Sequence, residues 1–214
     1  MTSMQHKFGA LDLIRAGLQD LDRARTLFDE LHNDGIDDDR MRLLLATLEK
    51  ACDPDIALSN LVDIIKVMQS QGKDFTNIIA DENSFVRLIT VLGVSDEMGK
   101  LMRFRPELVE AAANDACESH LYNHEQRRAH VLKSVGADPN DHTMPTASLP
   151  LAEAATALRK TYRKQLAAIM AQDATANDPI EIQPRISTEL SDLADAALEL
   201  SLIHISEPTR PISI

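Results

Sequence analysis

The stretch from 83 to 112 constrains the fold most strongly, because it contains three successive helical segments separated by tight turns. The first segment carries apolar residues at the spacing of one helix face. These residues are Phe85, Leu88, Ile89 and Leu92. We expect Gly93 to end this helix, since glycine enters a left-handed C-terminal cap without steric penalty. Ser95 should cap the second helix, and Pro106 should open the third.

The rest of the chain continues in the same rhythm, without sustained two-residue alternation. Its apolar residues are mainly Leu, Ala, Ile and Met, which favour helix over sheet. We therefore predict an all-α fold, an array of antiparallel helices and helical hairpins. Asp20 and the pair Asp53-Pro54 are helix-start signals. Further helical segments are expected at about 9–17, 21–33, 38–51, 54–71, 75–80, 125–135, 151–171 and from 187 onward, whereas 114–122 reads as ambiguous.

A proline-rich segment at 137–150 is expected to act as a linker, with Pro139, Pro145 and Pro150. It would separate an N-terminal helical array, 1–136, from a C-terminal helical pair, 151–199. A second loop is expected at 173–184, from Asp173 to Pro184.

We expect the last residues, 200–214, to form an artefactual tail. Leu200 to Pro211 reads LSLIHISEPTRP, which resembles the in-frame translation of a transposon-type sequencing adapter. We expect the genuine sequence to stop at Glu199, although a natural proline-containing tail is the alternative. Functional meaning is therefore not assigned to the tail.

The net charge of -12 argues against a protein that neutralises nucleic-acid phosphates over a wide face. No apolar run is long enough to span a membrane, and the N-terminus does not resemble a signal peptide. Cys52 and Cys117 stand far apart, which indicates neither a zinc framework nor a disulfide scaffold. A cytoplasmic protein without nucleic-acid or membrane partners is expected.

Histidines suggest one candidate metal site. His120 and His124 are four residues apart and could bind zinc from one helix face. However, the sequence from His124 to His130 is HEQRRAH, which does not match the H-E-x-x-H zinc motif. A solvated polar segment is the favoured interpretation, and zinc binding is the weaker one.

Acidic residues suggest two more candidates. The run containing Asp34, Asp37, Asp38 and Asp39 does not fit the register of a calcium-binding loop, so helix capping explains it better. Asp53 and Asp55 form an Asp-x-Asp pair, as in metal-binding nucleotidyltransferases. They lie at a proline-started helix without a preceding Gly-Ser turn or strand, so capping is again favoured.

The basic face of the segment 151–171 is the candidate binding site that we retain. Its residues are Arg159, Lys160, Arg163 and Lys164. Four cations within two helical turns can bind a phosphate or an acidic partner. A solvated helix face is the alternative, and no glycine-rich phosphate loop accompanies the cations.

Several blocks resemble the glutamine synthetase adenylyltransferase/adenylyl-removing family in its actinobacterial form. The central block is VLGVSDEMGKLMRFRPELVE, from 91 to 110. DLIRAGLQDLDRARTLFDEL and CDPDIALSNLVDIIKVM resemble the helical opening of such proteins. SVGADPNDH, LRKTYRKQLAAIMAQD and ISTELSDLADAALE resemble later blocks in the same order.

The resemblance implies an enzyme that transfers AMP from ATP to a tyrosine of glutamine synthetase and removes it by phosphorolysis. It further implies Mg²⁺ and ATP as cofactors, and glutamine synthetase and a nitrogen-signalling regulatory protein as partners. The family's Gly-Gly or Gly-Ser turn and Asp-x-Asp motif match no position here. We therefore expect an inactive N-terminal fragment, truncated before an α/β nucleotidyltransferase domain. The alternative is a non-catalytic helical module that binds an acidic partner.

Overall fold

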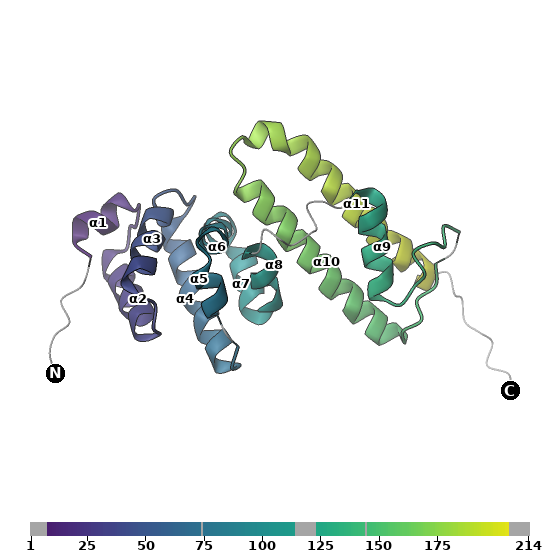
Figure 1. Cartoon of the computed structure of the whole chain (residues 1–214), viewed down its shortest axis with the longest axis horizontal. Coiled ribbons are helices and arrows are strands. Elements are labelled where there is room, and N and C mark those ends of the chain that lie inside the picture. The colour runs from purple at the N-terminus through teal and green to yellow at the C-terminus, as the bar shows by residue number, and fades with distance from the viewer. Residues whose placement is uncertain (1–7, 74, 114–122, 144, 206–214) are drawn as a thin grey trace. The chain divides into compact units, whose positions relative to one another are not determined.

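The computed structural model describes residues 8–73, 75–113, 123–143 and 145–205, and every regular element in these ranges is a helix (Figure 1). The predicted all-α fold class is confirmed. The described residues form two compact units, one ending at residue 113 and the other beginning at residue 123. Cys117, His120 and the rest of the segment 114–122, whose structure the sequence leaves ambiguous, lie outside the described residues. No helix in the described ranges is long and apolar enough to cross a membrane.

The described part of the first unit contains eight helices. They are α1 (Ala10–Arg15), α2 (Leu21–Asn33), α3 (Asp38–Leu48), α4 (Pro54–Ser70), α5 (Thr76–Ala80), α6 (Glu82–Val94), α7 (Asp96–Phe104) and α8 (Glu107–Ala113). Helix α4 packs against α2, α3, α6 and α7, and α6 also packs against α5 and α8. The two helices form the centre of this unit, which explains why both are buried on several faces.

Side-chain caps start the helices at several predicted positions. The Asp53 carboxylate accepts a hydrogen bond of 2.9 Å from the Ile56 amide, with Pro54 at the first helical position. The Ser95 hydroxyl accepts a bond of 3.2 Å from the Met98 amide at the start of α7. Such bonds satisfy amides that have no partner inside the helix. The predicted caps at Asp20, Asp53 and Ser95 are therefore confirmed.

The predicted role of Gly93 is wrong, because α6 continues through Gly93 to Val94. The glycine serves a close approach between helices instead. A Cβ atom at this position would lie 3.0 Å from the Ala51 Cβ and 3.3 Å from the Asp53 carbonyl oxygen. The Gly93 carbonyl also accepts a hydrogen bond of 3.1 Å from the Asp53 amide. Gly93 therefore lets the end of α6 pack closely against the turn between α3 and α4.

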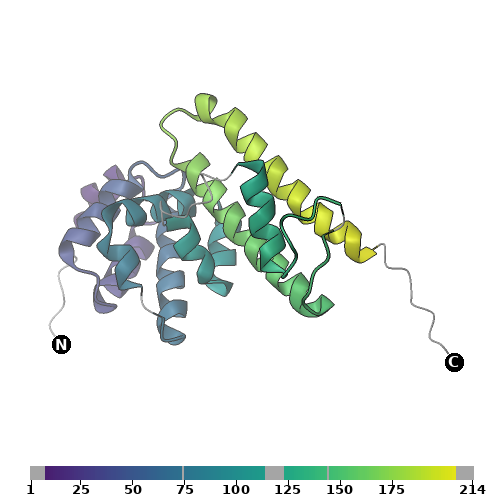
Figure 2. The same cartoon turned by 45° about the vertical axis from the view of Figure 1, so that its right-hand side comes forward.

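The second unit contains α9 (His124–Ser134), α10 (Leu151–Ala174) and α11 (Pro179–Ile205). Figures 1 and 2 show α10 and α11 as an antiparallel pair joined by a short loop, and α9 packs against both. The three helices and the segment after α9 share one apolar core. Its buried members are Val131, Leu132, Val135, Ala137, Ala154, Ile169, Ile186, Leu193, Ala196 and Leu200.

The boundary between the two units therefore lies before α9 and not after it. Helix α9, which we expected to belong to the N-terminal array, lies in the second unit. The segment 137–150, expected to link two domains, lies within that unit, where Ala137 is buried in its core. The prolines correctly indicate an irregular connection at 137–150, but they do not show which unit α9 belongs to. The packing of Val131 and Leu132 in the core of the second unit shows that.

Helix α11 begins at Pro179, eight residues before the predicted start at Ser187, so the predicted loop at 173–184 is wrong in its second half. The Asp178 carboxylate accepts hydrogen bonds of 2.9 and 3.1 Å from the amides of Ile180 and Glu181. Asp178-Pro179 is thus the same start signal as Asp53-Pro54. Pro184 lies inside the helix, where it lacks the amide that would bond to the Ile180 carbonyl. Burial of Ile186 in the core offsets this loss.

Replacing Asp178 with alanine is expected to destabilise the second unit by about 1 kcal/mol, because two amides lose their acceptor. Asp195→Ala, at an exposed position of the same helix, is the matched control and should change stability by less than about 0.5 kcal/mol. Amide hydrogen exchange in the first turns of α11 measures the difference. Equal exchange in the two variants would contradict a capping role.

The residues assigned to the tail begin inside α11, which extends to Ile205. Leu200, its first residue, is buried in the core of the second unit. Residues 206–214, including Glu207 and Arg210, lie outside the described residues.

Candidate functional site

The four predicted cations lie together in the middle of α10, which is 24 residues long. Arg159 and Lys160 are exposed, whereas Arg163 and Lys164 are half-buried. In the part of the chain that the structure describes, none of the four has a hydrogen bond or an ion pair. We call these residues, Arg159, Lys160, Arg163 and Lys164, the basic face of α10.

The basic face and the apolar stripe of α10 are adjacent but point in different directions. Leu158, Tyr162 and Leu166 pack against the core of the second unit. With 3.6 residues per turn, the four cations span an arc of about 140° that begins beside this stripe and extends around the helix. The apolar stripe therefore fixes the rotation of α10, and this rotation places the basic face away from the core.

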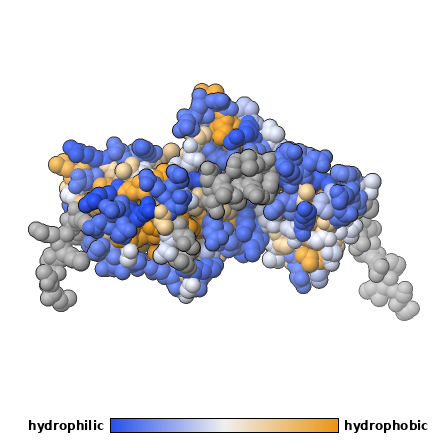
Figure 3. Space-filling view, viewed as in Figure 1, coloured by the Kyte–Doolittle hydropathy of each residue, from blue (hydrophilic) through white to orange (hydrophobic). Residues whose placement is uncertain are grey.

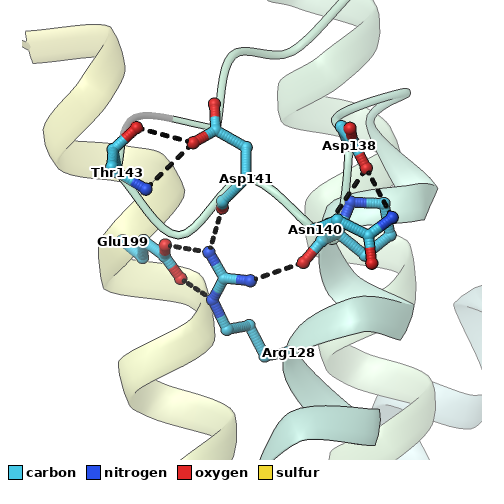
Figure 4. A network of polar contacts seen from close by, with 7 residues as sticks. Arg128, Asp138, Asn140, Asp141, Thr143 and Glu199 are labelled. Atoms are coloured by element: carbon cyan, nitrogen blue, oxygen red, sulfur yellow. Dashed lines mark hydrogen bonds and ion pairs between the residues drawn. The ribbon is translucent and has the colours of Figure 1, made fainter.

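Arg128 of α9 donates four hydrogen bonds within the second unit (Figure 4). Its Nε and Nη2 donate to the two carboxylate oxygens of Glu199 at 2.8 and 2.6 Å. Its Nη1 and Nη2 donate to the carbonyls of Pro139 and Asp141 at 2.9 and 2.7 Å. The hydrogen bond with Glu199 raises the pKa of Arg128. This guanidinium connects α9 to α11 and to the following loop, so its role is structural.

Arg127 is buried, with a side-chain exposure of 0%, and also faces into the unit. It donates to the Gln165 Oε1 of α10 at 3.0 Å and to the Glu189 Oε2 of α11 at 3.2 Å. Arg185 lies 3.5 Å from the other carboxylate oxygen of Glu189 and donates to Gln172 at 3.1 Å. Arg127 therefore joins all three helices of the second unit.

Sequence reasoning missed both arginines as structural residues. One signal was available for Arg127: it lies four residues before Val131, on the same face of α9. A charged residue in such a position is buried only when it is paired. The carboxylates that pair with Arg127 and Arg128 lie 62 and 71 residues away, beyond the reach of any local pattern.

The described residues do not favour the zinc hypothesis. His120 lies outside them, and His124 Nδ1 lies 3.0 Å from the Asp192 Oδ1 of α11. His130 also has an interaction partner. No group of three or more His, Cys, Asp or Glu side chains converges within the described ranges.

The carboxylates of Asp53 and Asp55 are used for backbone contacts. Asp53 caps α4, and Asp55 accepts hydrogen bonds of 2.9 and 3.4 Å from the amides of Gln19 and Asp20. Asp55 therefore ties α4 to the start of α2. In the acidic run, Asp37 caps α3 by accepting a bond of 2.8 Å from the Arg40 amide. These contacts support the capping interpretation of both acidic patterns.

The first unit has a hollow of about 420 Å³. Its apolar wall contains Ile36, Ile65 and Phe75, and Figure 3 shows apolar surface over α3 to α5. Arg40 on its rim already donates to the Ala80 carbonyl at 2.5 Å. Among the described residues, the basic face of α10 therefore has more cations without an ion-pair or hydrogen-bond partner than this hollow has.

Comparisons with known proteins identify relatives over most of the chain. The bifunctional glutamine synthetase adenylyltransferase/adenylyl-removing enzyme of Bifidobacterium longum (strain DJO10A) is 64% identical over 202 residues, which are 94% of this chain and 19% of that protein. The proteins of the same name from Cutibacterium acnes and Leifsonia xyli are 30% and 32% identical over 193 residues each, covering 90% and 89% of the chain. They are covered over 19% and 18% of their own lengths.

No protein-family profile matches the chain, and no solved structure matches it. The chain spans 19% of the length of the Bifidobacterium relatives. High identity over nearly the whole chain nevertheless confirms the relationship predicted from the sequence blocks. The chain resembles the N-terminal part of bifunctional glutamine synthetase adenylyltransferase/adenylyl-removing enzymes.

Proposed function

We propose that this chain is part of an enzyme that attaches AMP from ATP to a tyrosine of glutamine synthetase, removes it by phosphorolysis and so controls nitrogen assimilation. The observation that carries this proposal is the 64% identity over 94% of the chain to the Bifidobacterium longum enzyme. Glutamine synthetase and a nitrogen-signalling regulatory protein would be partners of the whole enzyme. Within it, the chain would supply helical support beside a nucleotidyltransferase domain.

The catalytic residues of such an enzyme would lie outside these 214 residues. Metal-dependent transfer needs carboxylates that are free to hold ions against phosphate oxygens. Asp53 and Asp55 instead accept hydrogen bonds from backbone amides. Asp53 and Asp55 therefore do not fit a Mg²⁺ site, and we assign no catalytic step to the described residues.

The chain alone is expected to lack both activities. Purified chain should release no AMP label from adenylylated glutamine synthetase with Mg²⁺ and phosphate, and should incorporate none from labelled ATP. The intact Bifidobacterium longum enzyme serves as the positive control. Magnesium-dependent release by the chain above the protein-free rate would contradict the proposed division of roles.

A chimaeric enzyme tests directly whether this chain can serve as a segment of the adenylyltransferase. Residues 8–199 of this chain would replace the aligned segment of the Bifidobacterium longum enzyme. We expect the chimaera to retain both activities within about tenfold, because tolerated core substitutions preserve volume and patterning. A folded chimaera without either activity would sink the proposed function.

A second candidate function is a non-catalytic helical module that binds an acidic partner. Four neighbouring cations without partners among the described residues favour this candidate. The two functions are compatible, since a segment of an enzyme can also form a contact surface.

A further inference from the structure

The charge around the basic face contrasts with the charge of the whole chain. Between Ala154 and Gln172 the sequence contains four cations and no carboxylate, in a protein of net charge -12. Many cations elsewhere lie against carboxylates, such as Lys66 with Glu30 at 2.8 Å and Arg103 with Asp63 at 2.6 Å. The basic face therefore concentrates positive charge without internal compensation, which is the arrangement expected of a surface that meets negative charge elsewhere.

The shape of this face indicates what kind of anion it can receive. A compact phosphate is bound by donors that converge, often backbone amides at a glycine-rich turn or a helix N-terminus. Here the cations lie in the middle of a helix, where the amides are already used, and they fan out over an arc of about 140°. Diverging side chains on a convex helix suit a broad acidic surface better than a single compact anion.

The spacing of the cations is regular. Arg159 and Arg163 are one helical turn apart, as are Lys160 and Lys164, so each pair is separated by about 6 Å along α10. Carboxylates at positions i and i+4 of another helix have the same spacing. Arginine binds carboxylates through two parallel hydrogen bonds, which favours Arg159 and Arg163 as the specific contacts.

We infer that the basic face of α10 is a docking surface for an acidic α-helix of a partner protein, whose carboxylates are spaced one turn apart. Arg159 and Arg163 bind the carboxylates directly, and Lys160 and Lys164 add long-range attraction. The inference rests on the second candidate function, and it names the partner chemistry that this function leaves open.

The test uses the full chain and a fluorescein-labelled, alanine-rich helical peptide with glutamates one turn apart, measured by fluorescence anisotropy. We expect binding that weakens as ionic strength rises from about 0.01 M to about 0.15 M. The double variant Arg159→Glu/Arg163→Glu should bind the peptide at least about tenfold more weakly. Arg15→Glu/Lys50→Glu, which reverses two exposed cations of the first unit, is the charge-matched control and should bind like the unaltered chain.

Three outcomes would overturn the inference. They are equal binding by the chain and its Arg159/Arg163 variant, equal weakening in the Arg15/Lys50 control, and tighter binding of inorganic tripolyphosphate than of the peptide. Circular dichroism checks folding, and Arg159→Gln/Arg163→Gln replaces the charge reversal if the reversal unfolds the chain. Activity of the chimaera does not depend on peptide binding, so failure here is distinguishable from failure of the enzyme assignment.

Discussion

Replacing Arg127 with methionine is expected to destabilise the second unit by about 3–5 kcal/mol, the range found when one partner of a buried ion pair is removed. The guanidinium is 0% exposed, and Glu189 is 7% exposed. Methionine would leave this carboxylate buried without the Arg127 guanidinium, while the Arg185 Nε lies farther away, at 3.5 Å. Gln165 would also lose the donor that binds its Oε1. The loss of stability therefore comes more from the buried Glu189 and Gln165 oxygens that lose their donor than from the lost hydrogen bonds themselves.

Hydrogen exchange measured by mass spectrometry can report each unit of the full chain separately. Exchange in α9, α10 and α11 should accelerate in Arg127→Met, whereas exchange in α4 and α6 should change little. Arg25→Met is the control, because Arg25 pairs with Asp22 at the surface and such pairs contribute about 0–1 kcal/mol. The double variant Arg127→Met/Glu189→Gln should recover part of the loss. A single variant as stable as the unaltered chain would show that Arg127 does not hold the three helices together.

Local start signals could be predicted from the sequence because they act within one helical turn. Asp53-Pro54 and Ser95 were recognised for this reason, since each cap bonds an amide three residues ahead. Asp178-Pro179 carries the same signal, but the segment 173–184 was predicted to be a loop. The packing of Ile186 on a core formed with α9 decides between the two, and this core is not visible in the local sequence.

Long-range packing explains the remaining differences. Gly93 was predicted to end a helix because a glycine follows an apolar stripe. The structure shows that a glycine is needed there because Ala51 and Asp53 lie so close. Arg159 and Lys160 are exposed and Arg163 and Lys164 half-buried, because an amphipathic helix turns its charged side outward. In contrast, the buried role of Arg127 depends on Glu189, which only the fold brings near. The exposure of a helical side chain thus follows from periodicity, whereas the partners of a buried charged side chain do not.

Replacing Gly99 with alanine is expected to destabilise the first unit by about 1–3 kcal/mol, as overpacking of a close contact does. Gly99 lies inside α7 and faces Asn60 of α4, which is 4% exposed. A Cβ atom at position 99 would lie 2.3 Å from the Asn60 Cγ and Nδ2 atoms. In an exposed helix the same change would stabilise by about 1 kcal/mol. The sign of the effect therefore reports the contact with Asn60 and not helix propensity.

A double-mutant cycle isolates this contact. Asn60→Ala removes the amide that the new methyl group would meet, so Gly99→Ala should be much less harmful in that background, with a coupling energy of at least about 1 kcal/mol. Gly93→Ala is a graded comparison, because its Cβ would meet atoms at 3.0 to 3.4 Å, and its effect should be smaller than that of Gly99→Ala. Urea unfolding followed by circular dichroism at the helix band gives the free energy of unfolding of the four proteins of the cycle and of Gly93→Ala. Additive losses in the cycle would mean that α4 and α7 do not meet at Asn60 and Gly99, and the close packing of α4 against α7 would need another explanation.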